Sequence, residues 1–424
     1  SLHHLGVQFN VTDDDELDLR NFGGQKKKRT AFAQSDTGKQ LMTALIDAVR
    51  REESAGTVER FPHHKFRTLL LSGNICGGCT VQDTYTGELL RFVCDAVLIA
   101  TGGLHGLFGD TTGSLANTGE VTAELFRLGV PMANLEMIQY HPTTVELGEK
   151  RMLLSEAARG EGGRLFALRN GKPWYFMEEK YPELGNLMPR DITVREVWTV
   201  SRDYEVFLDM TELPKEVMEH KLAGLVDDCQ TYLHKDIRKE PIPILPGIHY
   251  FMGGIQVDER HRTSMRNLYA AGECCAQYHG ANRLGGNSLL GAIYGGQIAA
   301  ETACRETVSS PNMPCAEESL LPELSPDAQM QMNRILLNAL GVVRDAQTLE
   351  AGIQEIRKLS GTLPLLGCAM LESALARKES RGAHWRADYP QRNDAVYCKT
   401  TVAHWNGQHI AISFESIPER RHDL

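Results

Sequence analysis

The sequence predicts a mixed α/β fold with more than one domain, and three observations lead to that prediction. Two short apolar runs, at residues 96–100 and in "NLYAAGE" at 267–273, end in glycine or other small residues, as buried strands of the parallel type do. Helical spacing of apolar residues recurs at 41–51, at 117–130 and beyond 311. The length of 424 residues exceeds that of a single ordinary domain.

The first hundred residues predict a helix followed by a β-meander. In "LMTALIDAVRR" the residues Leu41, Ala44, Leu45 and Ala48 share one helical face. Strands follow in "FRTLLLSG", "CTVQDTY" and "ELLRFVCDAVLIATGG", with turns at 76–79 and 86–87. The last run contains the buried strand 96–100 and ends at Gly102 and Gly103. Because ligands bind at the carboxyl ends of such strands, this glycine pair is a candidate ligand contact.

Cys76 and Cys79 form a lone CxxC motif, for which two interpretations are open. A metal site normally needs a second such pair, so the motif favours a hairpin turn through Gly77 and Gly78. Ten irregularly spaced cysteines in a chain of this size are typical of reduced residues in a reducing compartment. We therefore expect no metal ligands.

Composition divides the remaining chain. Between about 139 and 248, aromatic, proline and charged residues alternate with short strands, which indicates an inserted domain. Residues 249–304 return to a glycine-rich α/β texture, and helical periodicity beyond 311 leads into a polar tail containing "RKESRGAHWRADYP". The predicted segments are 1–138, 139–248, 249–310 and 311–424.

The charge balance excludes one class of partner. The net charge is −10 and the pI is about 5.9, which argues against nucleic acid as a ligand. The one dense basic cluster, residues 25–29, is typical of a solvated loop. No run approaches the roughly 18–20 apolar residues of a membrane span, and no secretory leader precedes Ser1. The expected location is the cytoplasm.

Several polar residues occur beside special turns, and each has an ordinary structural interpretation. Glu156 and Arg159 are spaced to share a helix face, as a surface ion pair would be. His141 precedes a proline, Arg190 begins a helix, and His249 precedes a glycine pair that interrupts a strand. Five of the residues beside such turns would together form a cationic, donor-rich pocket suited to a small dianion, namely His141, Ser155, Arg190, His249 and Arg283.

The order of the motifs resembles one family. "ATGG", "NTGE", "QYHPT", "SEAARGEGG", "PRD", "KEPIPILPGIHYFMGGI", "LYAAGE", "HGANRLGGNSL" and "ESRGAHWRADYP" follow one another as in the succinate dehydrogenase and fumarate reductase flavoproteins, a family that includes L-aspartate oxidase. The similarity runs from about Phe22-Gly23-Gly24 to about Pro390. It implies a dinucleotide-type FAD-binding domain without its N-terminal part, an inserted α+β capping domain and a C-terminal helical domain.

The resemblance also implies a reaction and roles for residues. In this family a hydride passes between flavin N5 and one carbon of fumarate, while an arginine protonates the other carbon. Arg190 matches that arginine, and Glu156 and Arg159 match the relay that returns its proton, which is needed because arginine has a pKa above roughly 12. The positions that match the substrate-binding residues are His141, Ser155, His249 and Arg283.

For the cofactor, the resemblance implies contacts to FAD from seven residues. Glu273 matches a carboxylate on the ribityl side, and Ser288 and Leu289 match backbone donors to the flavin ring. The others are Gly102, Gly103, Glu120 and Asn287, with Glu120 standing where the family usually has aspartate. Gly280, Gly285 and Gly286 are expected to leave room for close approach of the backbone to ligands.

Three further features depart from the family pattern. Ser155 stands where the family usually has threonine, and it keeps the hydroxyl donor. A lysine-rich stretch precedes "RTAF", and no G-x-G-x-x-G turn follows an early strand, so the pyrophosphate-binding part of the FAD site is expected to lie upstream of Ser1. The FAD site within this chain is therefore expected to be incomplete.

The resemblance implies partners as well. An iron-sulfur subunit and a membrane anchor would be separate chains, and attachment to the cytoplasmic membrane would be peripheral and through them. Two other functions stay open. The motif "SEAARGEGG" slightly favours L-aspartate oxidase, and the other alternative is a non-catalytic scaffold unable to hold FAD.

Overall fold

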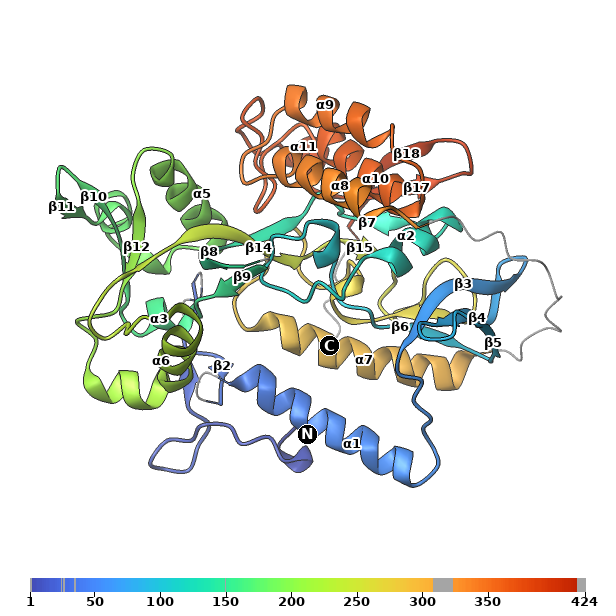
Figure 1. The fold of residues 1–424 in the computed structure, drawn as a ribbon, viewed down its shortest axis with the longest axis horizontal. Helices are drawn as coiled ribbons and strands as arrows, with labels where there is room; N and C mark the ends of the chain where they lie inside the picture. Colours follow the sequence, from blue (N-terminus) through green and yellow to red (C-terminus); the bar gives the residue numbers. More distant parts are fainter. Residues whose placement is uncertain are drawn as a thin grey trace. The chain divides into compact units, whose positions relative to one another are not determined.

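The computed structural model describes residues 2–417 except 24, 26, 34–35, 149 and 308–322. Gly24, Lys26 and the predicted boundary at 310/311 lie outside the described residues. The chain divides into two compact units. Unit 1 comprises residues 1–62, 141–247 and 284–289, and unit 2 comprises residues 63–140, 248–283 and 290–424. The mixed α/β class is confirmed (Figure 1), whereas the four-segment division stays a prediction.

Unit 1 contains small antiparallel sheets and mostly short helices. Its strands are β1 (Leu19–Arg20), β2 (Thr30–Ala31), β9 (Lys150–Leu153), β10 (Arg164–Arg169), β11 (Lys172–Trp174), β12 (Val206–Asp209) and β13 (Ile242–Pro243). Its helices and helical turns are η1 (Leu2–Leu5), α1 (Thr37–Ser54), α3 (Ala157–Gly160), α4 (Phe176–Lys180), η3 (Gly185–Leu187), α5 (Arg190–Ser201), η4 (Val217–Lys221), α6 (Ala223–Asp228) and η5 (Cys229–Leu233). Strands β11, β10, β12 and β13 form one sheet in that order, and a buried cluster including Leu154, Leu165 and Leu208 is the core.

Strands β8 (Ile138–Leu147) and β14 (Leu245–Phe251) have residues in both units. The remaining strands of unit 2 are β3 (His64–Ser72), β4 (Ile75–Asp83), β5 (Leu89–Val93), β6 (Val97–Ile99), β7 (Met132–Ala133), β15 (Gly254–Ile255), β16 (Leu268–Ala270), β17 (Lys399–Trp405) and β18 (Ile410–Ser416). Its helices and helical turns are η2 (His105–Leu107), α2 (Glu120–Arg127), η6 (Gly272–Cys274), α7 (Asn287–Glu306, whose first three residues belong to unit 1), α8 (Pro326–Ala339), α9 (Ala346–Ile356), α10 (Thr362–Ala376) and α11 (Asp394–Tyr397).

The predicted strands before and after the inserted segment come together in unit 2. Strand β6 pairs with β16 in parallel, with Ile99 opposite Ala270, so the carboxyl ends of both strands lie at the same edge. The prediction of parallel strands is confirmed, although β6 is less buried than expected because Leu98 is 41% exposed. The predicted meander β3-β4-β5 is also confirmed.

The predicted turn at Cys76–Cys79 is wrong, because all four residues lie within β4. The turn of this hairpin lies earlier, between the paired residues Ser72 and Ile75. Gly78 is needed for a different reason. A Cβ atom there would lie 1.9 Å from the carbonyl oxygen of Phe92 on β5, so the glycine permits close approach of a neighbouring strand.

The predicted polar tail is wrong as well. Residues 399–416 form the antiparallel hairpin β17–β18, which extends the sheet β15-β7-β17-β18. Figure 1 shows this hairpin beside helices α8–α10. Within "RKESRGAHWRADYP", Arg377, Glu379, His384 and Arg386 are fully buried, because they bind one another and nearby backbone groups.

Candidate functional site

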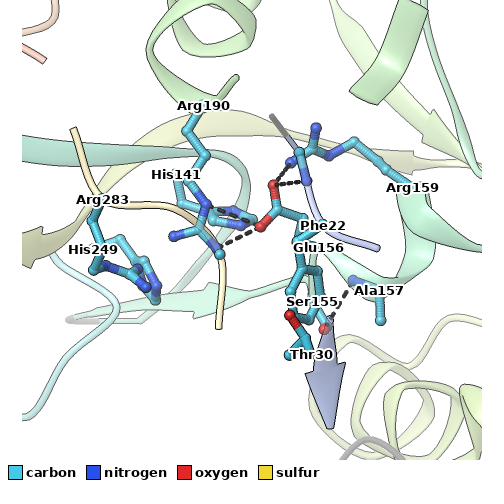
Figure 2. A network of polar contacts seen from close by, with 12 residues as sticks. Phe22, Thr30, His141, Ser155, Glu156, Ala157, Arg159, Arg190, His249 and Arg283 are labelled. Atoms are coloured by element: carbon cyan, nitrogen blue, oxygen red, sulfur yellow. Dashed lines mark hydrogen bonds and ion pairs between the residues drawn. The ribbon is translucent and has the colours of Figure 1, made fainter. Parts of the chain in front are cut away.

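A buried carboxylate lies at the centre of unit 1. Glu156 precedes the short helix α3, and its Oε1 accepts hydrogen bonds from Arg159 Nη2 at 3.0 Å and from the Gly23 amide at 3.2 Å. Its Oε2 accepts from Nε and Nη2 of Arg190, at 3.1 and 2.6 Å. Figure 2 shows the carboxylate held between the two guanidinium groups. We call Gly23, Glu156, Arg159 and Arg190 the Glu156 cluster.

The interpretation of Glu156 and Arg159 as a surface ion pair is wrong. The side chains of Glu156, Arg159 and Arg190 are 2%, 0% and 6% exposed. Burial lowers the pKa of Arg159, the charge of Glu156 raises it and the charge of Arg190 lowers it. Two cations therefore share one buried anion, whose charge compensates part of theirs.

Glycines make room for this carboxylate. A Cβ atom at Gly23 would lie 2.7 Å from Glu156 Oε1, and one at Gly285 would lie 2.5 Å from Oε2. The space expected at Gly285 is therefore filled by Glu156 and by Phe22, because a Cβ atom built at Gly285 would also lie 2.6 Å from the Cβ atom of Phe22. Nothing lies within 4 Å of a Cβ built at Gly280.

His141 and Ser155 are linked through β8 and the residues that follow β9. His141 is fully buried, and its Nδ1 lies 3.3 Å from the backbone amide of Thr143. The Thr143 hydroxyl donates to the carbonyl of Leu154, the residue before Ser155. The Ser155 hydroxyl accepts from the Ala157 amide at 3.2 Å, so it also caps the start of α3.

In unit 2, His249 and Arg283 are held from different elements. His249, on β14, has its Nδ1 2.8 Å from the hydroxyl of Thr112. Arg283 is 3% exposed, and its guanidinium lies 4.4 Å from the centre of the Tyr250 ring. This stacking on an aromatic face stabilises the cation while the side chain is withdrawn from water.

The adjacent ends of β6 and β16 carry glycines and one carboxylate. Gly102 and Gly272 have φ values of +72° and +80°, a region that favours glycine. Glu273 Oε1 accepts from the Phe251 amide at 2.9 Å and lies 3.4 Å from His105 Nε2. A Cβ atom at Gly103 would lie 2.5 Å from this carboxylate. Gly103 therefore leaves room for the carboxylate of Glu273, a hydrogen-bond acceptor at this edge whose side chain is 20% exposed.

The other residues predicted to contact the cofactor have separate surroundings. Glu120 is the first residue of α2, and its carboxylate accepts from Lys65 at 2.9 Å. Asn287 begins α7, as predicted, with Ser288 and Leu289 in the first turn, where backbone amides have no partner within the helix. The described residues contain no group of three or more His, Cys, Asp or Glu side chains that could hold a metal ion.

Sequence reasoning missed Gln139 and Tyr250. Gln139 is 1% exposed and binds the backbone of Arg283, and Tyr250 supplies the ring beneath the Arg283 guanidinium. Both lie in quoted motifs, "QYHPT" and "HYFMGG". The sequence gives no separate signal for Gln139, because β8 also contains Tyr140, His141, Thr143 and Thr144.

Comparisons with known proteins agree with these motifs. A family model described as FAD binding domain matches residues 1–289, and one described as Fumarate reductase flavoprotein C-term matches residues 360–421. The succinate dehydrogenase flavoprotein subunit of Bacillus subtilis is 37% identical over 98% of this chain and 80% of its own length. The fumarate reductase flavoprotein subunit of Mycobacterium tuberculosis is 33% identical over 95% of this chain and 79% of its own.

The chain is also similar to a solved structure and to a further sequence relative. E. coli quinol fumarate reductase superposes with a TM-score of 0.86 and 26% identity, covering 98% of this chain and 81% of that one. L-aspartate oxidase of Streptomyces coelicolor is a weaker relative, 29% identical over 98% of this chain and 78% of its own. The chain therefore belongs to the family of succinate dehydrogenase and fumarate reductase flavoprotein subunits, which are FAD-dependent oxidoreductases.

Proposed function

We propose that this flavoprotein interconverts succinate and fumarate and that Arg190 is its proton donor and acceptor. The observation that carries the proposal is the Glu156 cluster, in which a buried arginine at the start of α5 is bound by two hydrogen bonds to a buried carboxylate. A solvent-exposed arginine would exchange protons with water. Arg190, at 6% exposure, instead has a carboxylate partner through which its proton can be replaced.

FAD, when bound, supplies or accepts the hydride. In fumarate reduction the guanidinium of Arg190 gives a proton to one alkene carbon as the other receives the hydride, and succinate results. The resulting neutral arginine takes back a proton through Glu156, and Arg159 stabilises the carboxylate during the exchange. Succinate oxidation reverses each transfer, and Arg190 then accepts the proton.

We assign substrate carboxylate binding to His141, Ser155, His249 and Arg283. Each provides, or can provide, a hydrogen-bond donor, and Arg283 also brings a fixed positive charge. Such donors polarise fumarate and stabilise negative charge that develops as the hydride arrives. Support comes from the positions of these residues in the family motifs and from the restraint of each one by a contact within its own unit.

The edge formed by β6 and β16 fits part of FAD. Gly103 leaves space for Glu273, whose carboxylate would accept a hydrogen bond from a ribityl hydroxyl, and Gly102 lies beside it in the chain. The first-turn amides of α7 at Ser288 and Leu289 would donate to the polar edge of the flavin ring. We propose these residues, with Asn287 and Glu120, as FAD contacts.

We also propose that the chain works with separate iron-sulfur and membrane subunits, which would hold it peripherally at a membrane. The relatives are called flavoprotein subunits, and one similar structure is a quinol-fumarate reductase. Among the described residues, no helix is long and apolar enough to cross a bilayer.

The experiment measures both directions with the FAD-loaded flavoprotein. We expect fumarate-dependent oxidation of reduced viologen and succinate-dependent reduction of a dye acceptor. An FAD-loaded protein that turns over neither compound would overturn the proposal. L-aspartate is the comparison substrate, and formation of iminoaspartate at a higher kcat/KM than succinate oxidation would assign the chain to the aspartate oxidase branch.

A further inference from the structure

The segment 281–283, which we call the arginine loop, has no regular secondary structure. Because no helix or strand fixes it, the position of Arg283 depends on contacts made by other segments. Two such segments bind the loop from unit 2, the start of β8 and residues 381–386. The contact from β8 is made by Gln139.

Gln139 binds two consecutive residues of the arginine loop with one amide group. Its Nε2 donates to the carbonyl oxygen of Arg283 at 2.8 Å and to Oδ1 of Asn282 at 3.1 Å. Gln139 is 1% exposed. The bond to the Arg283 carbonyl is buried and the bond to Asn282 is partly buried, and a buried acceptor left without its donor is costly.

The second segment, residues 381–386, binds Ala281, the first residue of the arginine loop. The Ala383 amide donates to the Ala281 carbonyl at 2.8 Å. Gly382 permits this contact, because a Cβ atom there would lie 2.3 Å from the same carbonyl oxygen. Each of the three loop residues thus accepts at least one hydrogen bond from outside the loop.

The side chain of Arg283 extends from this fixed backbone over the Tyr250 ring. Tyr250 is 4% exposed and packs edge-on against His279, with ring centres 5.3 Å apart. A buried ring cannot follow a displaced arginine without opening the surrounding packing. A shift of the Arg283 backbone would therefore move the guanidinium away from both the ring and any bound carboxylate.

We propose that Gln139 is a positioning residue for Arg283, setting where that guanidinium meets the substrate carboxylate. This rests on the proposed function, because Arg283 is assigned there as a substrate ligand. Gln139 does not touch substrate in this scheme. Its effect is transmitted by the hydrogen bond to the Arg283 carbonyl.

The test replaces Gln139 by methionine, which keeps the volume but removes the donor. Since positioning of a carboxylate ligand affects the bound substrate and the transition state alike, Gln139→Met should raise the KM for fumarate about tenfold while kcat stays within about twofold. Gln139→Asn, which keeps an amide but withdraws it from the loop, should give an intermediate KM. Gln329→Met is the control, because it removes a partly buried amide from α8, where Gln329 contacts the Gly106 carbonyl instead.

A double-mutant cycle separates positioning from general stabilisation. In the Arg283→Ala background, Gln139→Met should change kcat/KM for fumarate less than about twofold, because the residue that Gln139 positions is gone. An equal loss of kcat/KM in both backgrounds would mean that Gln139 acts independently of Arg283, and the inference would be wrong.

The outcomes are distinguishable from failure of the proposed function. If the wild-type protein turns over neither fumarate nor succinate, the proposed function fails. If it is active and Gln139→Met and Gln139→Asn both keep the wild-type KM, only this inference fails. Should Gln139→Met not fold, the intermediate KM expected of Gln139→Asn decides the question.

Discussion

At the scale of single residues, Glu156 is unusual because a fully buried carboxylate is surrounded by donors. Four hydrogen bonds from Gly23, Arg159 and Arg190 reach its two oxygens. Transfer of a carboxylate from water into such a site is costly unless its charge is compensated, and here two cations do so. The same hydrogen bonds hold the guanidinium of Arg190 in place.

Replacing Glu156 by glutamine tests whether this carboxylate returns the proton to Arg190. The amide has nearly the same shape but cannot accept and pass on a proton, so Glu156→Gln should lower kcat about a hundredfold or more. Dicarboxylate binding, measured by calorimetry with malonate, should change less than about threefold, since Glu156 is not assigned to substrate binding.

The control for that variant lies on the same short segment. Glu161 follows α3, and its carboxylate lies 3.3 Å from Lys221. Glu161→Gln removes an equivalent charge outside the Glu156 cluster and should keep the wild-type kcat. A Glu156→Gln protein that also keeps the wild-type kcat would contradict the relay.

The sequence predicts some properties of these residues and not others. The pairing of Glu156 with Arg159 follows from their spacing, but their burial does not, because it depends on Gly23 and Gly285, which are distant in sequence. Spacing reports local neighbours only. Contacts over more than a hundred residues, such as that of Gly23 with Glu156, leave no periodic trace.

At the scale of elements, the segment 381–386 is built around a neutral histidine. His384 is fully buried, its Nδ1 accepts from Arg344 Nη1 at 2.9 Å, and its Nε2 donates to the Arg377 carbonyl at 3.1 Å. Burial lowers the pKa of His384 well below its usual value, and the charge of Arg344 lowers it further. A protonated ring would have to give up the bond from Arg344, because Nδ1 would then be a donor.

This arrangement predicts a loss of stability in acid. The unfolded chain binds a proton at His384 below pH ~6.5, whereas the folded chain does not until the pH reaches the lowered pKa. Stability from this group is thus present above pH ~6.5 and falls as the pH drops, by up to about 1.4 kcal/mol per pH unit. Urea unfolding of wild type and His384→Asn between pH 7.5 and 5.5 should show a shallower decline in the variant.

Other histidines require a control in this measurement. Burial also lowers the pKa of His261, and it lowers that of His279 to about 4, so wild type should lose stability at more than one site. The difference between the two curves isolates His384. His404→Asn, at an exposed position on β17, is the control for the effect of a histidine-to-asparagine replacement on overall stability. A parallel curve for His384→Asn would contradict the prediction.

Elements with strong local patterns were predictable, and those defined by distant partners were not. The start of α5 at Arg190, the start of α7 at Asn287 and the parallel strand at 268–270 follow from caps, glycines and apolar runs. The hairpin β17–β18 also had a local signal, since Asn406-Gly407 lies between strands of alternating character. Its polar composition obscured that signal.

At the scale of the whole molecule, unit 2 is assembled from three separated segments of the chain. Arg377, at the end of α10, joins two of them. Its Nε donates to Glu136 Oε1 at 2.7 Å, and its other nitrogens donate to Glu379 at 3.0 Å and to the carbonyl of Lys399 at 2.9 Å. One fully buried guanidinium therefore connects the segment before β8, the end of α10 and the start of β17.

Replacing Arg377 by methionine should destabilise this assembly strongly. The variant removes the cation that is paired with the buried carboxylate of Glu136, whereas Glu379 keeps its ion pair with Arg381. Removal of one partner from a buried ion pair costs about 3–5 kcal/mol. The free energy of unfolding, from urea titration at pH 7.5, measures the loss. Arg392→Met makes the same replacement in an exposed pair, where Arg392 and Asp394 are 61% and 58% exposed, and should leave the free energy of unfolding close to that of wild type. Equal losses for the two variants would mean that Arg377 does not join the segments.

Substitution of Glu136 by glutamine in the Arg377→Met protein should recover part of the lost free energy of unfolding, because one uncompensated charge is then removed.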